Sequence, residues 1–318
     1  MAVTDQKNIS SQRLSVPSKK QQVQTRIPLI FWLLTTDDFA TFVGPNTAFG
    51  IFGALAGPIL VDHPSSILSV LLRIPKVIAF NWLNLLIFDF ANQRLPQSVQ
   101  EDTINKPWRP IPSGLITSEQ MRKTMLVTIP LVLALDHYVF HVGLEAQLIP
   151  TFTWLYNDLG GAEDWIPRNI IIAGGFVLGN AGSLKVAAGI SPNQPARLTF
   201  GGTIWVTLIS SVILTTMHVQ DLKDKEGDHA RGRRTAPIVL GERMCRWSIA
   251  IPVVAWSWLC TRFWDIGIWA AAPMALGGVV VWRCLMLQGK RSDRRTWQLW
   301  ALWTATLYTL PILCNPYW

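Results

Sequence analysis

Long apolar stretches separated by short polar segments make up the chain from residue 27 onward. About nine of these stretches approach the roughly 20 residues that a helix needs to cross a bilayer. The pattern predicts spans near 41–61, 67–90, 121–140, 141–157, 166–190, 199–219, 247–263, 266–287 and 296–314. The apolar run at 27–34 is too short to span and predicts an interfacial lead-in to the first helix. We therefore expect an all-α, multi-pass membrane protein with one transmembrane domain over 27–318.

The composition agrees with a membrane protein. The 318 residues are 50% hydrophobic and 15% charged, whereas a soluble domain carries about a quarter charged residues. Residues 1–26 are polar and lack the hydrophobic core of a signal peptide, so they predict a disordered tail. The cysteines have no CxxC spacing, and we expect them to serve as small apolar packing residues: Cys245, Cys260, Cys284 and Cys314.

Basic residues are divided unequally between the two expected faces of the membrane. With nine spans, about 22 of the 28 Lys and Arg fall on the side of the N-terminus, and Arg197 and Arg262 lie in loops on the other side. The positive-inside rule then places the tail and the charged loops in the cytosol. The net charge of +8 reflects this topology and attraction to anionic lipid, and it requires no nucleic acid. The remaining bases fall inside expected spans: Arg73, Lys76, Lys185 and Arg283.

A strongly charged segment, QDLKDKEGDHARGRRTAPIVLGE, follows the sixth expected span at 220–242. Asp221, Asp224 and Asp228 are spaced i, i+3 and i+7, which stacks their carboxylates on one face of a helix. Like charges so placed repel, unless a cation lies between them. Mg²⁺ takes such oxygen ligands and shares them with phosphate, and the arginines that follow can supply donors to phosphate oxygens. The segment predicts a metal–diphosphate site, and a solvated helix anchor is the simpler alternative.

A second polar segment, 81–114, follows the second expected span on the same face. Asn81, Asn84, Phe88 and Asn92 form one helical stripe with Asp89 beside it, and buried amides of this kind face a cavity or a partner. Further along the chain come acids, bases and prolines, with no regular helix expected through the prolines: Glu101, Asp102, Lys106, Pro107, Arg109, Pro110 and Pro112. We expect a stiff loop that holds its two bases in place.

Together the two segments resemble the motifs of the UbiA-type intramembrane prenyltransferases. DTINKPWRPIPSG, 102–114, is similar to the end of the first Asp-rich motif of that family, and DLKDKEGDHARGRRTAPIVLGE, 221–242, is similar to the second almost throughout. The resemblance implies nine transmembrane helices around a central cavity. It also implies an isoprenoid diphosphate as substrate and Mg²⁺ as cofactor, both bound at the cytosolic face.

The front of the first motif departs from the family pattern. Phe88 stands where the family has Asn, and Asp89 and Asp102 lie further apart than the usual motif allows. This variant, FDFANQ followed by EDTINKPWRPIPSG, is similar to the fungal UbiA-type terpene cyclases. The resemblance therefore implies a class I cyclase in terpenoid secondary metabolism that ionises a prenyl diphosphate, with farnesyl diphosphate expected, in a eukaryotic endomembrane.

The resemblance also implies the roles of particular residues. The expected metal ligands are Asp89, Asn92, Glu101, Asp102, Asp221, Asp224 and Asp228. Among these, the expected catalytic carboxylates are Asp89, Asp102, Asp221 and Asp224, while the expected diphosphate contacts are Lys106, Arg109, Lys225 and Arg234. Aromatic faces stabilise a carbocation, and Trp82 and Trp205 are the aromatics expected in the cavity. Lys185 is expected to face the cavity or to extend to the membrane surface.

Other functions remain open at this level. A prenyltransferase would use the same motifs with a separate acceptor substrate. A transporter could line its pathway with the intramembrane amides and Lys185, but transporters usually place polar sites near the midplane, and here the acids gather at one face. A scaffold without catalysis would not depend on Asp221 or Asp224. The lipid bilayer is the expected surrounding, and no obligate protein partner is evident.

Overall fold

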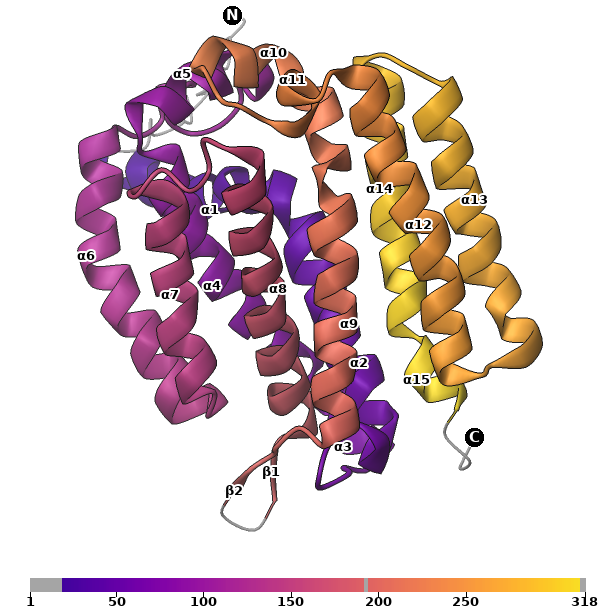
Figure 1. Cartoon of the computed structure of the whole chain (residues 1–318). Helices are drawn as coiled ribbons and strands as arrows, with labels where there is room; N and C mark the ends of the chain where they lie inside the picture. The colour runs from indigo at the N-terminus through magenta and orange to yellow at the C-terminus, as the bar shows by residue number, and fades with distance from the viewer. Residues whose placement is uncertain (1–18, 192–193, 315–318) are drawn as a thin grey trace, which may run out of the picture.

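The computed structural model describes residues 19–191 and 194–314, and most of them are helical (Figure 1). The first helices are α1 (Lys19–Asp38), α2 (Gly44–Leu55), α3 (Ile67–Leu72), α4 (Ile74–Gln93), α5 (Pro96–Asn105), α6 (Ser118–Leu135), α7 (Gly143–Asn157) and α8 (Trp165–Ala188). The later helices are α9 (Phe200–Thr216), α10 (Asp221–Arg231), α11 (Ala236–Val239), α12 (Glu242–Trp264), α13 (Ala271–Met286), α14 (Lys290–Tyr308) and α15 (Leu310–Leu313). A short antiparallel hairpin pairs β1 (Ile190–Ser191) with β2 (Gln194–Pro195), with Ile190 opposite Pro195 and Ser191 opposite Gln194. The expected all-helical class is confirmed.

Six helical segments in the described part of the chain are long and apolar enough to cross a membrane: Ile27–Leu55, Ile67–Gln93, Ser118–Phe140, Trp165–Ala188, Phe200–Arg231 and Gly267–Met286. The first differs from the first expected span, 41–61, at both ends. A π-helical turn, Phe39–Val43, joins α1 to α2 without a break. The apolar run 27–34 is therefore part of the first candidate span and not a separate lead-in, and this candidate ends at Leu55 instead of at 61.

Three further helices occupy the remaining expected spans, 141–157, 247–263 and 296–314. These helices, α7, α12 and α14, are not among the six segments. The count of about nine spans therefore stays a prediction. The expected tail, 1–26, lies outside the described residues as far as residue 18, and α1 begins at Lys19 within the range assigned to it.

Helix α8 is the centre of the bundle, and it packs against α2, α4, α7 and α9, while α12, α13 and α14 form a neighbouring layer (Figure 1). Its contact with α2 is close because both helices carry small residues. A Cβ on Gly50 would lie 2.6 Å from the carbonyl oxygen of Ser183. Small residues let helices approach closely in a membrane, where packing rather than the hydrophobic effect drives association.

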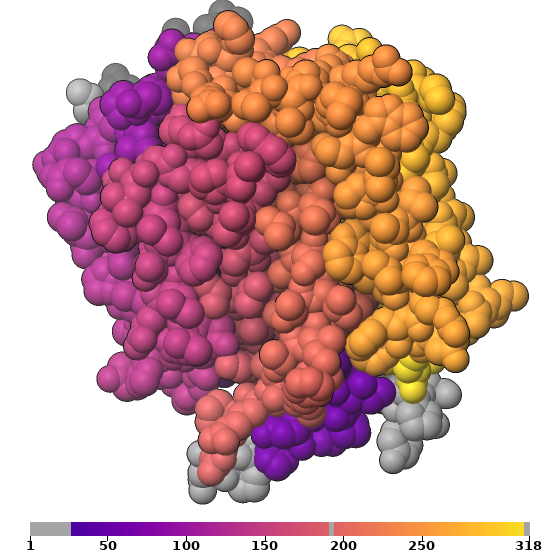
Figure 2. Space-filling view, viewed as in Figure 1, coloured from indigo at the N-terminus to yellow at the C-terminus, as the bar shows by residue number. Residues whose placement is uncertain are grey.

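The two ends of the bundle differ. A cap made of α5, α10 and α11 lies across one end, and α3 and the β hairpin lie at the other (Figure 1). The space-filling view shows the segment around α10 and α11 covering the upper end (Figure 2). Gly227 of α10 permits the contact with α5, because a Cβ there would lie 2.1 Å from Nδ2 of Asn105. Residues 106–116, which follow α5, contain turns and no helix, as predicted from their prolines.

Candidate active site

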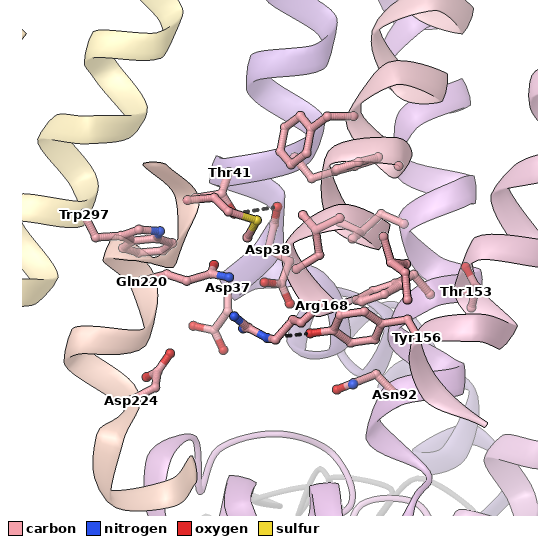
Figure 3. Close-up of a pocket in the computed structure, with 18 of the residues that line it drawn as sticks. Asp37, Asp38, Thr41, Asn92, Thr153, Tyr156, Arg168, Gln220, Asp224 and Trp297 are labelled. Atoms are coloured by element: carbon pink, nitrogen blue, oxygen red, sulfur yellow. Dashed lines mark hydrogen bonds between the residues drawn. The ribbon is translucent and has the colours of Figure 1, made fainter. Parts of the chain in front are cut away.

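An open cavity lies beneath the cap and has about 1500 Å³ of space, including solvent at its mouth. Helices α1, α4, α7, α8, α10 and α14 all contribute to its wall. Figure 3 shows Asn92, Arg168 and Asp224 arranged around the same space, although they come from α4, α8 and α10. The cavity therefore joins the two charged segments that are far apart in the sequence.

The carboxylates of the second segment lie on one helix, as their spacing predicted. Asp224 and Asp228 line the cavity, and Asp221 is buried behind them on α10. Each of the three carboxylates has a base beside it. Nη1 of Arg168 lies 2.6 Å from Oδ1 of Asp221, and Nζ of Lys223 lies 2.5 Å from Oδ2 of Asp224. Nη1 of Arg233 lies 3.4 Å from Oδ1 of Asp228. Their mutual repulsion is thus relieved by side chains, and the stripe does not by itself require a cation.

The first segment divides between the cavity and the protein interior. Asn92, Glu101, Lys106 and Arg109 line the cavity. Asp102 is buried behind Arg109, whose Nη1 donates to both carboxylate oxygens of Asp102 at 3.1 and 3.0 Å. This pair fixes one edge of the cavity mouth, because a bidentate carboxylate–guanidinium contact holds the orientation of both groups.

Asp89 is the other expected ligand that lies behind the wall. Its side chain is buried, and Gln93 donates a weak hydrogen bond to its Oδ1 at 3.4 Å. Asp38 of α1 lies beside it and receives an ion-pair contact from Arg109 at 3.0 Å. Asp89 therefore belongs to a carboxylate–guanidinium cluster at the junction of α1, α4 and the turn after α5.

The acids of α1 are functional candidates that sequence reasoning missed. Asp37 and Asp38 both line the cavity, and Asp37 accepts a hydrogen bond from Nε1 of Trp108 at 3.2 Å. The sequence does mark these two residues, since two adjacent carboxylates interrupt an apolar stretch in WLLTTDDFATF. Such charges within a span are costly unless they have a partner. It was lost because the first span was expected to start at residue 41.

Arg168 is a second missed candidate. It lies in the first turn of α8, lines the cavity, and donates to the hydroxyl of Tyr156 at 3.2 Å as well as to Asp221. Its position before an apolar run is typical of an ordinary cytosolic anchor, so nothing in the local pattern distinguishes it. Only its contact with α10, 53 positions later, identifies it as part of the site.

Six bases line the cavity, alongside the carboxylates of Asp37, Asp38, Glu101, Asp224 and Asp228. The bases are Lys106, Arg109, Arg168, Lys223, Arg233 and Arg294. Burial and the neighbouring Arg109 lower the pKa of Lys106, but the cavity carboxylates, led by Asp38, outweigh them and raise it above its ordinary value. The ammonium of Lys106 therefore stays charged. Arg294 has no ion-pair partner among the described residues, so its charge remains available to an anion.

Lys225 and Arg234, two expected diphosphate contacts, do not line this cavity. Lys225 pairs with Glu242 at 2.6 Å. Arg234 is exposed, with its nearest carboxylate, that of Asp164, at 3.4 Å. Lys225 follows Asp224 directly on α10, where one helical step turns a side chain toward another face. Arg234 lies beyond the end of α10, in a β-bridge with Asp164.

Away from the cap, the cavity wall becomes apolar and aromatic. Along α8, Arg168 at the mouth is followed two turns deeper by Phe176, and along α7, Tyr156 is followed by Phe152. The other aromatic wall residues are Phe42, Phe88, Trp297 and Trp300. The expectation for Trp82 and Trp205 was wrong.

These two tryptophans serve in packing. Trp82 donates to Oγ1 of Thr35 at 3.0 Å and packs toward α1. Trp205 is buried against α12, with ring centroids of Trp264 at 5.2 Å and Phe263 at 6.2 Å. The aromatic wall comes instead from helices whose inner faces the sequence alone did not identify.

The residues present fit a hard divalent cation only in part. In the described part of the chain, no three Asp, Glu, His or Cys side chains converge to hold a metal ion without help. However, Oδ2 of Asp221 and Oδ2 of Asp228 are buried without a hydrogen-bond partner among the described residues. Mg²⁺ is commonly held by one or two carboxylates and completed by substrate phosphate and water, so this donor set fits an ion shared with a phosphate.

Comparison with known proteins agrees with the fold. The model of the UbiA prenyltransferase family matches residues 47–307. Somaliensene A/B synthase of Streptomyces somaliensis is 28% identical over 88% of this chain and 93% of its own length. In the fungus Hericium erinaceus, the diterpene cyclase eriG is 28% identical over 85% of this chain and 83% of its own length.

The same fungus also has a similar protein with a different printed activity. Its polyprenyl transferase eriF is 28% identical over 85% of this chain and 89% of its own length. Among solved structures, a UbiA homolog from Archaeoglobus fulgidus bound to GPP and Mg²⁺ superposes with a TM-score of 0.60. That match covers 88% of this chain and 99% of the homolog at 14% identity, so it bears on the fold alone.

Proposed function

We propose that this chain, which belongs to the UbiA prenyltransferase family, is a membrane-embedded class I terpene cyclase that acts on farnesyl diphosphate. The observation that carries the proposal is a single cavity with a charged mouth and an aromatic, apolar interior. A prenyl diphosphate has the matching form, a polyanionic head on an apolar tail. The named activities of the synthase from Streptomyces and the cyclase eriG support the same reaction class.

In this proposal the bases at the mouth bind the diphosphate. Lys106, Lys223 and Arg233 approach it from the turn after α5 and from the α10 region, and Arg294 approaches from α14. Their charges oppose the negative charge that develops on the leaving group, which lowers the barrier to ionisation. Arg109, held by Asp102 and Asp38, orients this edge of the mouth.

Mg²⁺ is the proposed cofactor, and Asp224, Asp228, Asn92 and Glu101, which line the cavity, would hold it. When bound, it supplies charge neutralisation and Lewis acidity at the diphosphate. Asp89, Asp102 and Asp221 lie behind these residues. Asp102 pairs with Arg109 and Asp221 pairs with Arg168, two bases of the cavity wall.

The interior of the cavity is proposed to receive the prenyl chain. Phe88, Tyr156 and Trp300 belong to its wall, and aromatic faces stabilise a neighbouring cation by their quadrupoles. Exclusion of water protects the allylic cation from being quenched before its ring closes. The product skeleton would then follow from the shape of this wall.

The chain is an integral membrane protein, since six apolar helical segments accompany the family assignment. We further propose that α7, α12 and α14 also cross the bilayer, giving about nine spans. The cap, rich in Lys and Arg, would then face the cytosol according to the positive-inside rule. A eukaryotic endomembrane is the proposed location.

The alternative is transfer of the prenyl group to a separate acceptor, which the similarity to the polyprenyl transferase eriF favours. The test is to incubate the purified protein with farnesyl diphosphate and Mg²⁺ in the absence of any acceptor. We expect a cyclic hydrocarbon and inorganic diphosphate, detected by gas chromatography–mass spectrometry. Substrate that is consumed only after an acceptor is added would instead establish the transferase.

A matched pair of variants controls this experiment. Asp224→Asn alters a carboxylate that lines the cavity. Asp265→Asn alters an exposed carboxylate at the C-terminal end of α12, away from the cavity. We expect product formation to fall at least about a hundredfold in Asp224→Asn, to stop when EDTA removes divalent ions, and to be unchanged in Asp265→Asn.

A further inference from the structure

Three of the basic residues that the sequence places inside membrane spans meet at the end of the bundle opposite the cap. Arg73, Lys76 and Lys185 line a second, smaller pocket together with His141 and Gly189. This pocket has about 510 Å³ of space, including open solvent. It lies where α4 begins and α8 ends, beside the β hairpin (Figure 1). The cyclase proposed above gives these residues no role.

Arg73 is held in the pocket by neutral groups. Its Nη1 donates to the carbonyl oxygen of Ala188 at 2.7 Å and to Oγ of Ser65 at 3.0 Å. Gly189 makes room for it, because a Cβ there would lie 2.3 Å from Cζ of Arg73. The guanidinium is therefore fixed in place while its charge has no carboxylate partner among the described residues.

The other charges of the pocket leave a positive excess. Lys185 pairs with Glu145 at 2.6 Å, and these two cancel. Lys76 has no hydrogen bond or ion pair among the described residues, and its Nζ lies 6.0 Å from the ring centroid of Phe140. Together, Arg73 and Lys76 contribute two positive charges that nothing in the described protein neutralises. An unpaired charged side chain within a membrane span is costly. Such a side chain is usually retained because it binds a partner of opposite charge.

Exposed apolar side chains flank the same pocket along the chain. Leu72, next to Arg73, is 71% exposed, and Tyr138 and Leu144, on either side of His141, are 74% and 64% exposed. A soluble anion would gain nothing from these groups, whereas acyl chains would cover them. The pocket thus combines the two features of an anionic lipid site, bases for the phosphate and an apolar rim for the tails.

We propose that this pocket binds the phosphate group of an anionic phospholipid. Lys76 and Arg73 contact the phosphate, and the lipid tails lie along the exposed side chains of α3 and α7. The site is separate from the proposed diphosphate site, so it can be tested without catalysis.

The experiment is native mass spectrometry of the whole protein in detergent with three probes: phosphatidylglycerol, phosphatidylcholine and inorganic phosphate. Lys76→Gln removes one charge from a half-buried side chain with no partner to disturb. Arg262→Gln is the matched control, since its exposed pair with Asp265 lies at the same end of the bundle. Circular dichroism spectra that match the wild type establish that both variants fold.

We expect the wild type and Arg262→Gln to prefer phosphatidylglycerol to phosphatidylcholine, and Lys76→Gln to bind phosphatidylglycerol about fivefold more weakly. Inorganic phosphate that binds the wild type as tightly as phosphatidylglycerol does, and loses affinity in Lys76→Gln, would retain the anion site but assign it to a soluble phosphate. A preference for phosphatidylglycerol that is unchanged in Lys76→Gln, or no preference at all, would overturn the proposal.

Discussion

Buried carboxylates around the main cavity lie against bases, some of them close in the sequence and some far along the chain. Asp221 pairs with Arg168, and Asp102 pairs with Arg109. A buried charge is stabilised by such a partner, and it becomes strongly destabilising when the partner is removed. The site is therefore a set of ion pairs in which each side chain depends on its neighbour, and single substitutions are expected to affect stability and chemistry together.

The pair of Arg168 and Asp221 allows these two effects to be separated. Their side chains are 8% and 1% exposed. We expect Arg168→Gln to lower the free energy of unfolding by about 3–5 kcal/mol, because it leaves the carboxylate of Asp221 buried without its counter-charge. The double variant Arg168→Gln/Asp221→Asn regains most of this loss but remains inactive. Thermal unfolding in detergent and product formation measure the two quantities.

An exposed pair provides the control for this prediction. Arg122 and Glu119 lie on the surface of α6, and their side chains are 50% and 56% exposed. Arg122→Gln should change the free energy of unfolding by less than about 1 kcal/mol. Equal losses in Arg122→Gln and Arg168→Gln would contradict the role assigned to the buried pair.

At the scale of elements, the site depends on how α5 and α10 close over the cavity. Asn105 of α5 donates to the carbonyl oxygen of Asp224 at 3.2 Å, and Arg231 of α10 donates to Oγ of Ser98 at 2.6 Å. Arg231 also pairs with Glu163 in the turn before α8 at 2.6 Å. These contacts join α5 to α10 within the cap and join α10 to the bundle. They thereby position the bases at the cavity mouth.

We expect Gly227→Ala to disturb this cap. Its Cβ would lie 2.1 Å from Nδ2 of Asn105, so α5 and α10 must separate or Asn105 must give up its hydrogen bond. Activity should fall, and Asn105→Ala in the same chain should restore part of it by removing the clash. Product formation and limited proteolysis of the cap provide the measurements.

Gly278→Ala is the matched glycine in α13, because no atom lies within 4 Å of its added Cβ. This variant should be neutral or stabilised by about 0.5–1 kcal/mol, since alanine loses less backbone entropy in a helix. Comparable losses of activity in Gly278→Ala and Gly227→Ala would show that the contact between α5 and α10 is not responsible.

At the scale of the whole molecule, charge is distributed along the bundle axis. The end of the bundle with the cap holds most of the charged segment 220–242 and the residues between α4 and α6. The opposite end holds the small basic pocket and Arg262. If the cap faces the cytosol, the proposed diphosphate substrate would enter from that side, and its prenyl chain would lie within the bilayer. The smaller pocket then faces the opposite leaflet.

Cysteine labelling tests this orientation. Arg234 at the cap and Arg262 at the opposite end have exposed side chains, 70% and 68%. The native cysteines Cys245, Cys260 and Cys284 are buried, and Cys314→Ala removes the one of intermediate exposure. In sealed microsomes, a membrane-impermeant maleimide should label Arg234→Cys at once and Arg262→Cys only after permeabilisation. The reverse pattern would place the cap in the lumen.

The sequence alone determined the helical class, the membrane location and the family, because these depend on local quantities. Apolar length predicts a span whatever surrounds it, and the i, i+3, i+7 spacing placed Asp221, Asp224 and Asp228 on one helix face, as the structure has them. The turns after α5 likewise followed from Pro107, Pro110 and Pro112, since proline excludes a helix by its own ring.

Only the tertiary structure decided which side chains meet. Asp38, Arg168 and Trp300 enter the same cavity from α1, α8 and α14, and no spacing within one helix could reveal this. The inner face of a helix that is apolar all round is chosen by its neighbours and not by its own pattern, which is why Trp82 and Trp205 were misplaced. The pairs between distant positions, Asp221 with Arg168 and Asp38 with Arg109, have the same cause, because ion pairs form between groups that packing brings within a few ångströms.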